Sequence, residues 1–300
     1  MIARKYLYLI ALARERHFGR AAAACHVSPS TLSSAISDLE SELGVPVVER
    51  GKQFAGLTAE GRCVLEYAQR VAAMASGLRQ ELASLRDGLT GRLTLGVIPT
   101  GLTVVASLSA AMARRHPLVT IEVRSLSTGE ILDGLRHFRL DAGVAYVESG
   151  REPDLDTLAL WEEDHVFLTP AAGPLEGREE IGWVEAAAQP LCLLTPDMQN
   201  RRIIDQVFAS LGCQPRPSLE TNSIVSLLAH VSAGCWSSIV PRSVLDLIGT
   251  PQGVRVLRLV APQVTWATGL VTLRTEHPAP MVAALRAVAG DLRQSFGNDE

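Results

Sequence analysis

The chain has 300 residues, 47% of them apolar and 20% charged, with a formal net charge of −4. This composition is normal for a globular protein of two or three domains. No apolar run approaches the roughly 18 residues that a membrane span needs, which argues against a membrane protein. The five cysteines are scattered and the seven histidines do not cluster, so we expect no disulfide framework, no metal site and no cofactor.

The first part of the chain differs in charge from the rest. Residues 1–87 carry 11 basic against 9 acidic side chains, whereas the remainder carries 17 against 23. This difference is too small to establish nucleic-acid binding by itself. Arg14, Glu15 and Arg16 interrupt the N-terminal apolar stretch, and no signal-peptide cleavage pattern follows, so we expect a cytoplasmic protein.

Residues 1–58 are typical of short helices separated by turns. Apolar residues at helical spacing predict a first helix through Tyr6, Leu9, Ile10 and Ala13, and the run after Phe18 predicts a second. Ser28 has the side chain of an N-cap, and Pro29 suits the first turn of a third helix, which ends at Gly44. The apolar face of that helix is expected to be Leu32, Ile36, Leu39 and Leu43. Residues 45–57 predict two short strands around a turn.

The other face of the third helix is rich in small hydroxyl side chains. Such groups suit contacts to phosphates and to base edges in a major groove, although a solvated serine-rich helix is the alternative. Basic residues on the following turn can reach a phosphate. The predicted DNA-contact residues are Ser28, Pro29, Ser30, Thr31, Ser33, Ser34, Ser37, Arg50 and Lys52.

Residues 59–89 predict one long helix with apolar residues at alternating spacings of four and three. So narrow an apolar stripe is buried only if it packs against another helix, and a helix of a second chain is the simplest partner. A helical hairpin within the chain is the alternative, but no second heptad helix is present to form it. The predicted dimerisation residues are Val64, Ala68, Val71, Ala75, Leu78, Leu82, Leu85 and Leu89.

Residues 92–300 alternate strands and helices, which favours a mainly parallel sheet. The expected strands are 92–98, 119–125, 141–147, 190–195, 237–241 and 268–273. The expected helices are 102–115, 129–138, 200–211, 223–233 and 279–295. Two further apolar segments, about 158–168 and 264–272, are expected to cross between two subdomains.

The stretch HFGRAAAACHVSPSTLSSAISDLESELGVPVVERGKQFAGLTAEGRCVL, residues 17–65, resembles the DNA-binding segment of LysR-type transcriptional regulators. Its matching positions include Phe18, Ala21, Leu32, Gly44 and Thr58, and the resemblance extends more weakly along the whole chain. Two positions depart from the family pattern, which usually has Gln where Pro29 stands and Arg where Ser34 stands. Both are DNA-contact positions in the family, so the operator or the number of base contacts is expected to differ here.

The resemblance implies a multi-domain protein. It implies that residues 1–58 form a winged helix-turn-helix, which is mainly α, and that residues 59–89 form a linker helix. Residues 92–300 are expected to form an α/β effector domain of periplasmic-binding-protein type, with one lobe at about 92–164 and 269–300 and the other at about 165–268. It also implies binding to a pseudo-palindromic DNA site, a homodimer that assembles to a homotetramer, and possible contact with RNA polymerase.

Hydroxyl and amide side chains at strand-to-helix junctions predict where an effector binds. Ligands of α/β sheets lie beyond the carboxyl ends of the strands, where helix N-termini attract anions. The family places effector contacts at positions matching Thr100 and Thr128. For the side chains at 221–223, the alternative to effector binding is that they only cap the following helix. For the arginines at 201 and 202, the alternative is a position on the surface. The predicted effector-binding residues are Thr100, Ser127, Thr128, Thr195, Asn200, Arg201, Thr221 and Asn222.

If one arginine faces the cleft, a small carboxylate is the natural ligand. Residues 193–208 also resemble regulators associated with formate dehydrogenase operons, which makes formate a candidate effector. Two other classes of function are disfavoured by the sequence. An enzyme is disfavoured, because no nucleophile elbow, P-loop or dinucleotide-binding motif is present. An architectural DNA-binding protein is disfavoured by the acidic balance after residue 87.

Overall fold

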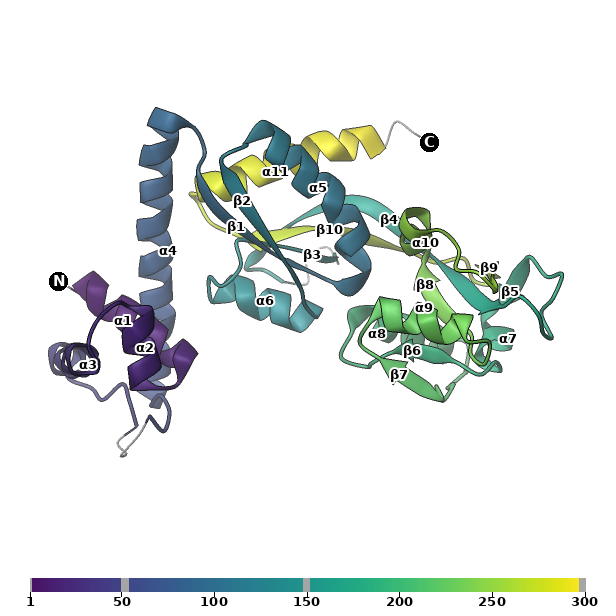
Figure 1. The fold of residues 1–300 in the computed structure, drawn as a ribbon, viewed down its shortest axis with the longest axis horizontal. Coiled ribbons are helices and arrows are strands. Elements are labelled where there is room, and N and C mark those ends of the chain that lie inside the picture. Colours follow the sequence, from purple (N-terminus) through teal and green to yellow (C-terminus); the bar gives the residue numbers. More distant parts are fainter. Residues whose placement is uncertain (1, 50–53, 148–151, 297–300) are drawn as a thin grey trace. The chain divides into compact units, whose positions relative to one another are not determined.

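The computed structural model describes residues 2–49, 54–147 and 152–296 (Figure 1). The chain divides into two compact units, Met1–Leu89 with His137–Arg139, and Thr90–Arg136 with Leu140–Glu300. Within the described residues, no helix is both long enough and apolar enough to cross a membrane.

The first unit begins with the helices α1 (Ile2–Glu15), α2 (Phe18–Ala24) and α3 (Pro29–Leu43). Ser28 caps α3 by accepting a hydrogen bond from the backbone N–H of Thr31, and Gly44 ends the helix in the left-handed conformation at φ 71°. These boundaries confirm the sequence-based prediction. The helices pack around a core that includes Leu9, Leu12, Ala21, Ala22, Leu32, Ile36, Leu39 and Val47.

A short wing segment follows α3, and within the described residues it contains one bridge pair, Val48 with Leu57. The helix α4 (Ala59–Asp87) begins at Thr58, whose hydroxyl accepts from the backbone N–H of Gly61 at 2.8 Å. Gly61 lies so close to Val47 that a Cβ there would be 1.9 Å from the Val47 carbonyl oxygen. Glycine is therefore required where the wing meets α4.

The second unit contains two lobes. Lobe 1 holds the strands β1 (Gly91–Val97), β2 (Val119–Ser125) and β3 (Ala142–Tyr146). Its helices are the short 3-10 turn η1 (Pro99–Gly101), α5 (Leu102–Arg115), α6 (Thr128–Arg136) and the C-terminal α11 (Pro280–Phe296). The predicted strands and helices of this lobe are confirmed to within two residues at their ends.

Lobe 2 holds β5 (Glu180–Gly182), β6 (Cys192–Leu194), β7 (Leu219–Thr221), β8 (Ser238–Pro241) and β9 (Val254–Val260). Its helices are α7 (Trp183–Ala187), α8 (Gln199–Ser210), α9 (Ile224–Ser232) and α10 (Arg242–Ile248). The sequence did not predict β5, α7, β7, α10 and β9, most of which are too short to show a period. Two apolar clusters fill the lobe, one around Phe167, Trp183 and Phe208 and one around Leu168, Leu227 and Val240.

The long strands β4 (Leu155–Pro170) and β10 (Thr265–Leu273) connect the lobes, as the two apolar segments predicted. The sheet order is β2-β1-β3-β10-β4-β9-β5, and β8 also pairs with β4. The expected parallel arrangement is correct for β1 with β2 and β3, for β5 with β9 and for β6 with β7. It is wrong for β4 and β10, which run antiparallel to each other and to β9 and β3 respectively. Strand β4 carries the chain from lobe 1 to lobe 2 and β10 brings it back, so the two strands run in opposite directions.

Candidate DNA-binding surface and effector cleft

Helix α3 exposes the hydroxyl-rich face that the sequence predicted. Leu32, Ile36 and Leu39 are buried in the core, whereas Leu43, expected beside them, is 37% exposed because the helix ends there. The exposed residues of the opposite face are Ser28, Pro29, Ser30, Thr31, Ser33, Ser34 and Ser37. Arg50 and Lys52, also predicted to contact DNA, lie outside the described residues.

The first turn of α3 holds a hydrogen-bonded group of hydroxyls. Ser28 Oγ accepts from the Thr31 backbone N–H at 3.1 Å and lies 2.8 Å from the hydroxyl oxygens of both Ser30 and Thr31. The Ser28 hydroxyl therefore serves as the helix cap and also orders its two neighbours. Those neighbours stand at the helix N-terminus, the end that a helix-turn-helix protein turns toward base edges.

Helix α4 carries an exposed apolar stripe, but only part of the predicted seam belongs to it. Ala68 is fully buried and Val64 packs against the core of the same unit, so both are used within the chain. The side chain of Leu85 lies outside the described set, and Leu89 follows the end of the helix. Ala75 is exposed, as are the large apolar residues Tyr67 (59%), Val71 (39%), Met74 (75%), Leu78 (59%) and Leu82 (56%).

A narrow pocket lies between the two lobes of the second unit. Lobe 1 contributes residues from η1, β3 and the start of α6, and lobe 2 contributes the end of β6 and the start of α8. We call this the deep pocket; its lining residues are Ile98, Pro99, Thr100, Ser127, Thr128, Tyr146, Leu194, Met198, Gln199 and Asn200. Its free volume is about 10 Å³, enough for about one water molecule.

A larger cavity of about 560 Å³ adjoins the deep pocket and shares Thr128, Tyr146 and Gln199 with it. We call this the outer cavity. It brings Arg202 and Arg274 to the same space as Glu152 and Asp156. The Arg274 guanidinium already donates to Asp156 Oδ1 at 2.9 Å, so part of this charge is neutralised within the protein.

The predicted residues Thr100, Ser127, Thr128 and Asn200 meet in the deep pocket. Thr100 is buried, and its hydroxyl lies 3.5 Å from Tyr146 Oη. Ser127 forms a capping box on α6: its backbone N–H donates to Glu130 Oε2 at 2.8 Å, and its hydroxyl accepts from the Glu130 N–H at 3.3 Å. Within the described part of the chain, the buried Thr128 Oγ1 has no hydrogen-bond partner.

A buried polar network lies beneath this pocket, and most of its residues were not predicted from the sequence. Tyr146 donates its hydroxyl hydrogen to Glu163, which also accepts from the Ser243 hydroxyl at 3.3 Å. Asn200 Nδ2 donates to Tyr146 Oη at 3.1 Å and lies 2.7 Å from His165 Nε2. Glu163 and His165 stand two residues apart on β4, so their side chains share one face of the strand.

Burial controls the ionisation of this network. It raises the pKa of the Glu163 carboxyl, against the hydrogen bonds from Tyr146 and Ser243. Burial, with the nearby Glu163 charge, also raises the pKa of the Tyr146 hydroxyl. It lowers the pKa of His165 to about 4, so the imidazole is neutral at pH 7. Because Asn200 donates to Nε2, the ring proton is assigned to Nδ1.

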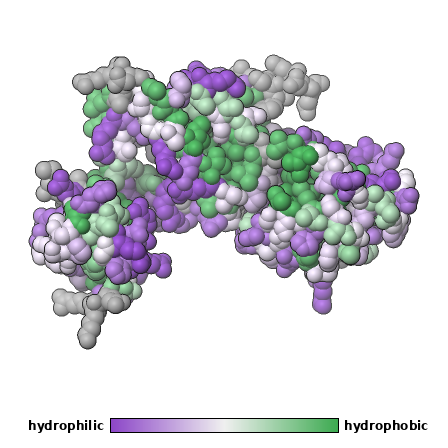
Figure 2. Space-filling model, in the orientation of Figure 1, coloured by the Kyte–Doolittle hydropathy of each residue, from purple (hydrophilic) through white to green (hydrophobic). Residues whose placement is uncertain are grey.

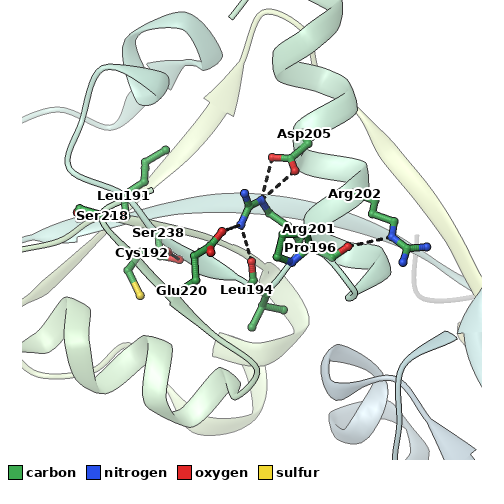
Figure 3. Close-up of polar contacts among 10 residues, drawn as sticks. All are labelled: Leu191, Cys192, Leu194, Pro196, Arg201, Arg202, Asp205, Ser218, Glu220 and Ser238. Carbon is green, nitrogen blue, oxygen red and sulfur yellow. Dashed lines mark hydrogen bonds and ion pairs between the residues drawn. The ribbon is translucent and has the colours of Figure 1, made fainter. Parts of the chain in front are cut away.

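Figure 3 shows the Arg201 guanidinium directed toward Asp205, Glu220 and the Leu194 carbonyl oxygen, all of lobe 2. Its guanidinium donates to Glu220 Oε1 and to the Leu194 carbonyl oxygen, each at 2.7 Å, and to both Asp205 oxygens at 2.9 Å. Arg202 turns to the Pro196 carbonyl oxygen at 3.0 Å. Arg201 therefore joins α8 to β6 and β7, and it lines neither the deep pocket nor the outer cavity.

The remaining predicted effector residues lie beside lobe 2 strand ends. Thr195 donates its backbone N–H to the Thr221 carbonyl oxygen at 2.9 Å, and Thr221 Oγ1 accepts from the Ser223 N–H at 3.3 Å. Asn222 is exposed. None of Thr195, Thr221 and Asn222 lines either cavity described above. For the residues of the buried polar network that were not predicted, the sequence offered one signal. The polar residues Glu163 and His165 stand two positions apart within an apolar segment.

Apolar side chains are also exposed on the second unit, over α5 and α10, as Figure 2 shows. Exposed large residues of these helices and of α9 are Leu102 (38%), Val225 (76%), Leu247 (62%) and Ile248 (55%). Exposed apolar side chains that gather on one face of a domain are a candidate interaction surface.

A helix-turn-helix with a free polar face, joined to a two-lobed domain with an interlobe pocket, defines a DNA-binding regulator with an effector domain. Residues 3–62 match the bacterial regulatory helix-turn-helix proteins of the lysR family, and residues 86–293 match the LysR substrate binding domain. The chain therefore belongs to the LysR family of transcription regulators, and it is not an enzyme.

Individual relatives agree with this assignment. A probable hydrogen peroxide-inducible genes activator of Streptomyces viridosporus is 33% identical over 273 residues, covering 90% of this chain and 82% of the relative. A full-length OxyR variant from Pseudomonas aeruginosa is 28% identical, with a TM-score of 0.79 and coverage of 98% of this chain and 95% of that one. Full-length CbnR in complex with its target DNA shares the fold at 23% identity and a TM-score of 0.70, covering 97% of this chain and 100% of that one.

Proposed function

We propose that this regulator responds to a small carboxylate that binds in the cleft between the lobes of its effector domain. The observation that carries the proposal is the deep pocket, where α8 begins without a side-chain cap and where all lining side chains are uncharged. Helix N-termini present N–H groups and the positive end of the helix dipole, which favour an anion. Thr100, Thr128 and Asn200 are the side chains proposed to contact it, and formate is the first candidate to test.

A thermal shift of the full chain tests this proposal. Sodium formate and sodium acetate are expected to raise the unfolding temperature more than sodium chloride does at the same ionic strength. Thr128→Val removes a buried hydroxyl while keeping the shape, and it is expected to reduce the shift. Asn222→Ala, an exposed change outside both cavities, serves as the matched control. Equal shifts for all salts would refute the carboxylate proposal.

Thiol oxidation is disfavoured at the proposed pocket itself, although several relatives are named for induction by hydrogen peroxide. All five cysteines lie in the described residues, and none lines the deep pocket or the outer cavity. Cys192 is buried in β6, and burial raises the pKa of its thiol to about 11, which suppresses the reactive thiolate.

For the DNA, we propose that the exposed face of α3 reads a pseudo-palindromic site upstream of a promoter, where RNA polymerase is the proposed partner. The hydroxyls of Ser30, Thr31, Ser33, Ser34 and Ser37 provide the contacts. Purified protein is expected to prefer its own upstream intergenic DNA over unrelated DNA, with affinity falling as salt rises. Equal affinity for both fragments would contradict sequence-specific reading.

For the assembly, we propose a homodimer through the exposed stripe of α4 and a homotetramer through the apolar surface over α5 and α10. Leu78→Glu places a charge in the middle of the stripe and is expected to lower the mass measured by light scattering. Ser76→Glu lies on the opposite side of the same helix and is the control. A wild-type protein of monomer mass would overturn the proposed assembly.

A further inference from the structure

The base of the deep pocket is closed by a contact between the two lobes. Asn200, at the start of α8 in lobe 2, donates an amide hydrogen to Tyr146 Oη, at the end of β3 in lobe 1, at 3.1 Å. We call this contact the Asn200–Tyr146 bridge. The pocket that it closes has room for about one water molecule, with a free volume of about 10 Å³. An organic effector can therefore fit between Asn200 and Tyr146 only if these two side chains move apart, which breaks the bridge.

The groups behind the bridge determine which side chain donates and which accepts. Tyr146 has one hydroxyl hydrogen, and it goes to the buried carboxylate of Glu163. Toward the pocket, the tyrosine oxygen can therefore only accept. Asn200 directs its other amide hydrogen to His165 Nε2 at 2.7 Å, which holds the amide nitrogen in place as a donor. Opening the bridge thus frees a donor on lobe 2. Among the described residues, the long 3.5 Å contact to Thr100 is then the one remaining contact through which the tyrosine oxygen can accept, while its hydrogen stays with Glu163.

Further donors stand on both sides of the pocket. Helix α8 begins at Gln199, and its first backbone N–H groups have no partner within the helix. The N-cap residue Met198 makes no side-chain capping hydrogen bond to them. Across the cleft, the buried Thr128 hydroxyl makes no hydrogen bond within the described residues. A carboxylate can accept from Asn200 and from these groups, but it offers nothing to the Tyr146 oxygen.

We infer that the effector is a small hydroxy acid that replaces both halves of the Asn200–Tyr146 bridge. Its carboxylate accepts from the Asn200 amide and the first N–H groups of α8, and its hydroxyl donates to Tyr146 Oη. This inference rests on the proposed carboxylate effector and narrows its chemical class. An acid without a donor, formate included, leaves the buried tyrosine oxygen poorly paired, which weakens its binding.

Matched pairs of acids test the inference by calorimetric titration of the full-length protein. Glycolate is compared with acetate, and lactate with propionate, since each pair differs by one hydroxyl group. The wild type is expected to bind the hydroxy acid about 5- to 10-fold more tightly, the effect of one net hydrogen bond. Tyr146→Phe removes the acceptor and is expected to abolish this preference. Asn200→Ala keeps the tyrosine hydroxyl and is expected to retain it.

The outcomes separate this inference from the proposed function. Equal affinities within each pair, together with measurable binding, would overturn the hydroxy acid and leave the carboxylate effector in place. Binding of none of the four acids, nor of formate, would remove both. A hydroxyl preference that survives Tyr146→Phe would show that another group reads the hydroxyl, and would overturn the assignment to Tyr146. If Tyr146→Phe does not fold, Asn200→Ala still tests whether Tyr146 reads the hydroxyl group. Loss of the preference for the hydroxy acid in Asn200→Ala would contradict that assignment.

Discussion

Lowering the pH from 7 to 5 is expected to destabilise the effector domain through His165. Burial lowers the pKa of this imidazole from 6.5 to about 4, against a smaller opposing effect of Asp164. At pH 5 the folded domain therefore keeps the ring neutral, whereas the unfolded chain takes up the proton. Because the unfolded state binds more protons, the free energy of unfolding falls below about pH 6.5, and the loss levels off below pH 4. These two pKa values correspond to a loss of about 2 kcal/mol between pH 7 and pH 5.

Urea unfolding followed by tryptophan fluorescence measures this loss selectively. The protein has four tryptophans, Trp161, Trp183, Trp236 and Trp266, all in the second unit. The variant His165→Gln removes the titrating ring, so its stability is expected to fall about 2 kcal/mol less than that of the wild type over this pH range. His277→Gln, at an exposed site, is the control and is expected to follow the wild type. If His165→Gln and the wild type lose the same stability, the argument from burial is refuted.

Three further changes test other parts of the structure. Gly61→Ala would place a Cβ 1.9 Å from the Val47 carbonyl oxygen, so we expect about 2 kcal/mol of destabilisation and weaker DNA binding. Thermal unfolding and a gel shift measure these two effects, and the exposed Ser76→Ala is the control. Ser28→Ala removes the cap of α3 and is expected to destabilise the first unit by about 1 kcal/mol, measured by circular dichroism; an unchanged transition would contradict the capping role. Arg201→Ala is expected to lower effector-domain stability by about 2 kcal/mol while leaving carboxylate affinity unchanged. A loss of affinity without a loss of stability would instead show that Arg201 contacts the effector.

The sequence by itself determined the elements that follow local rules. Ser28, Pro29 and Gly44 set the ends of α3 through capping chemistry and backbone conformation, both of which act within a few residues. Apolar periodicity likewise predicted α4 and α5, and it identified the segments that became β4 and β10. The exposed hydroxyl face of α3 follows from the same period, because the residues opposite Leu32 and Ile36 must face outward.

Only the tertiary structure decided which polar residues meet. Tyr146 and Asn200 are 54 positions apart and come together because β3 and α8 end and begin at the same cleft. The neighbours Asn200 and Arg201 contact different parts of the protein, because adjacent helical residues point about 100° apart. Asn200 faces the pocket, whereas Arg201 pairs with Glu220, 19 positions away. Capping, periodicity and charge describe a residue's own element, whereas its partners depend on how that element packs against elements far away in the chain.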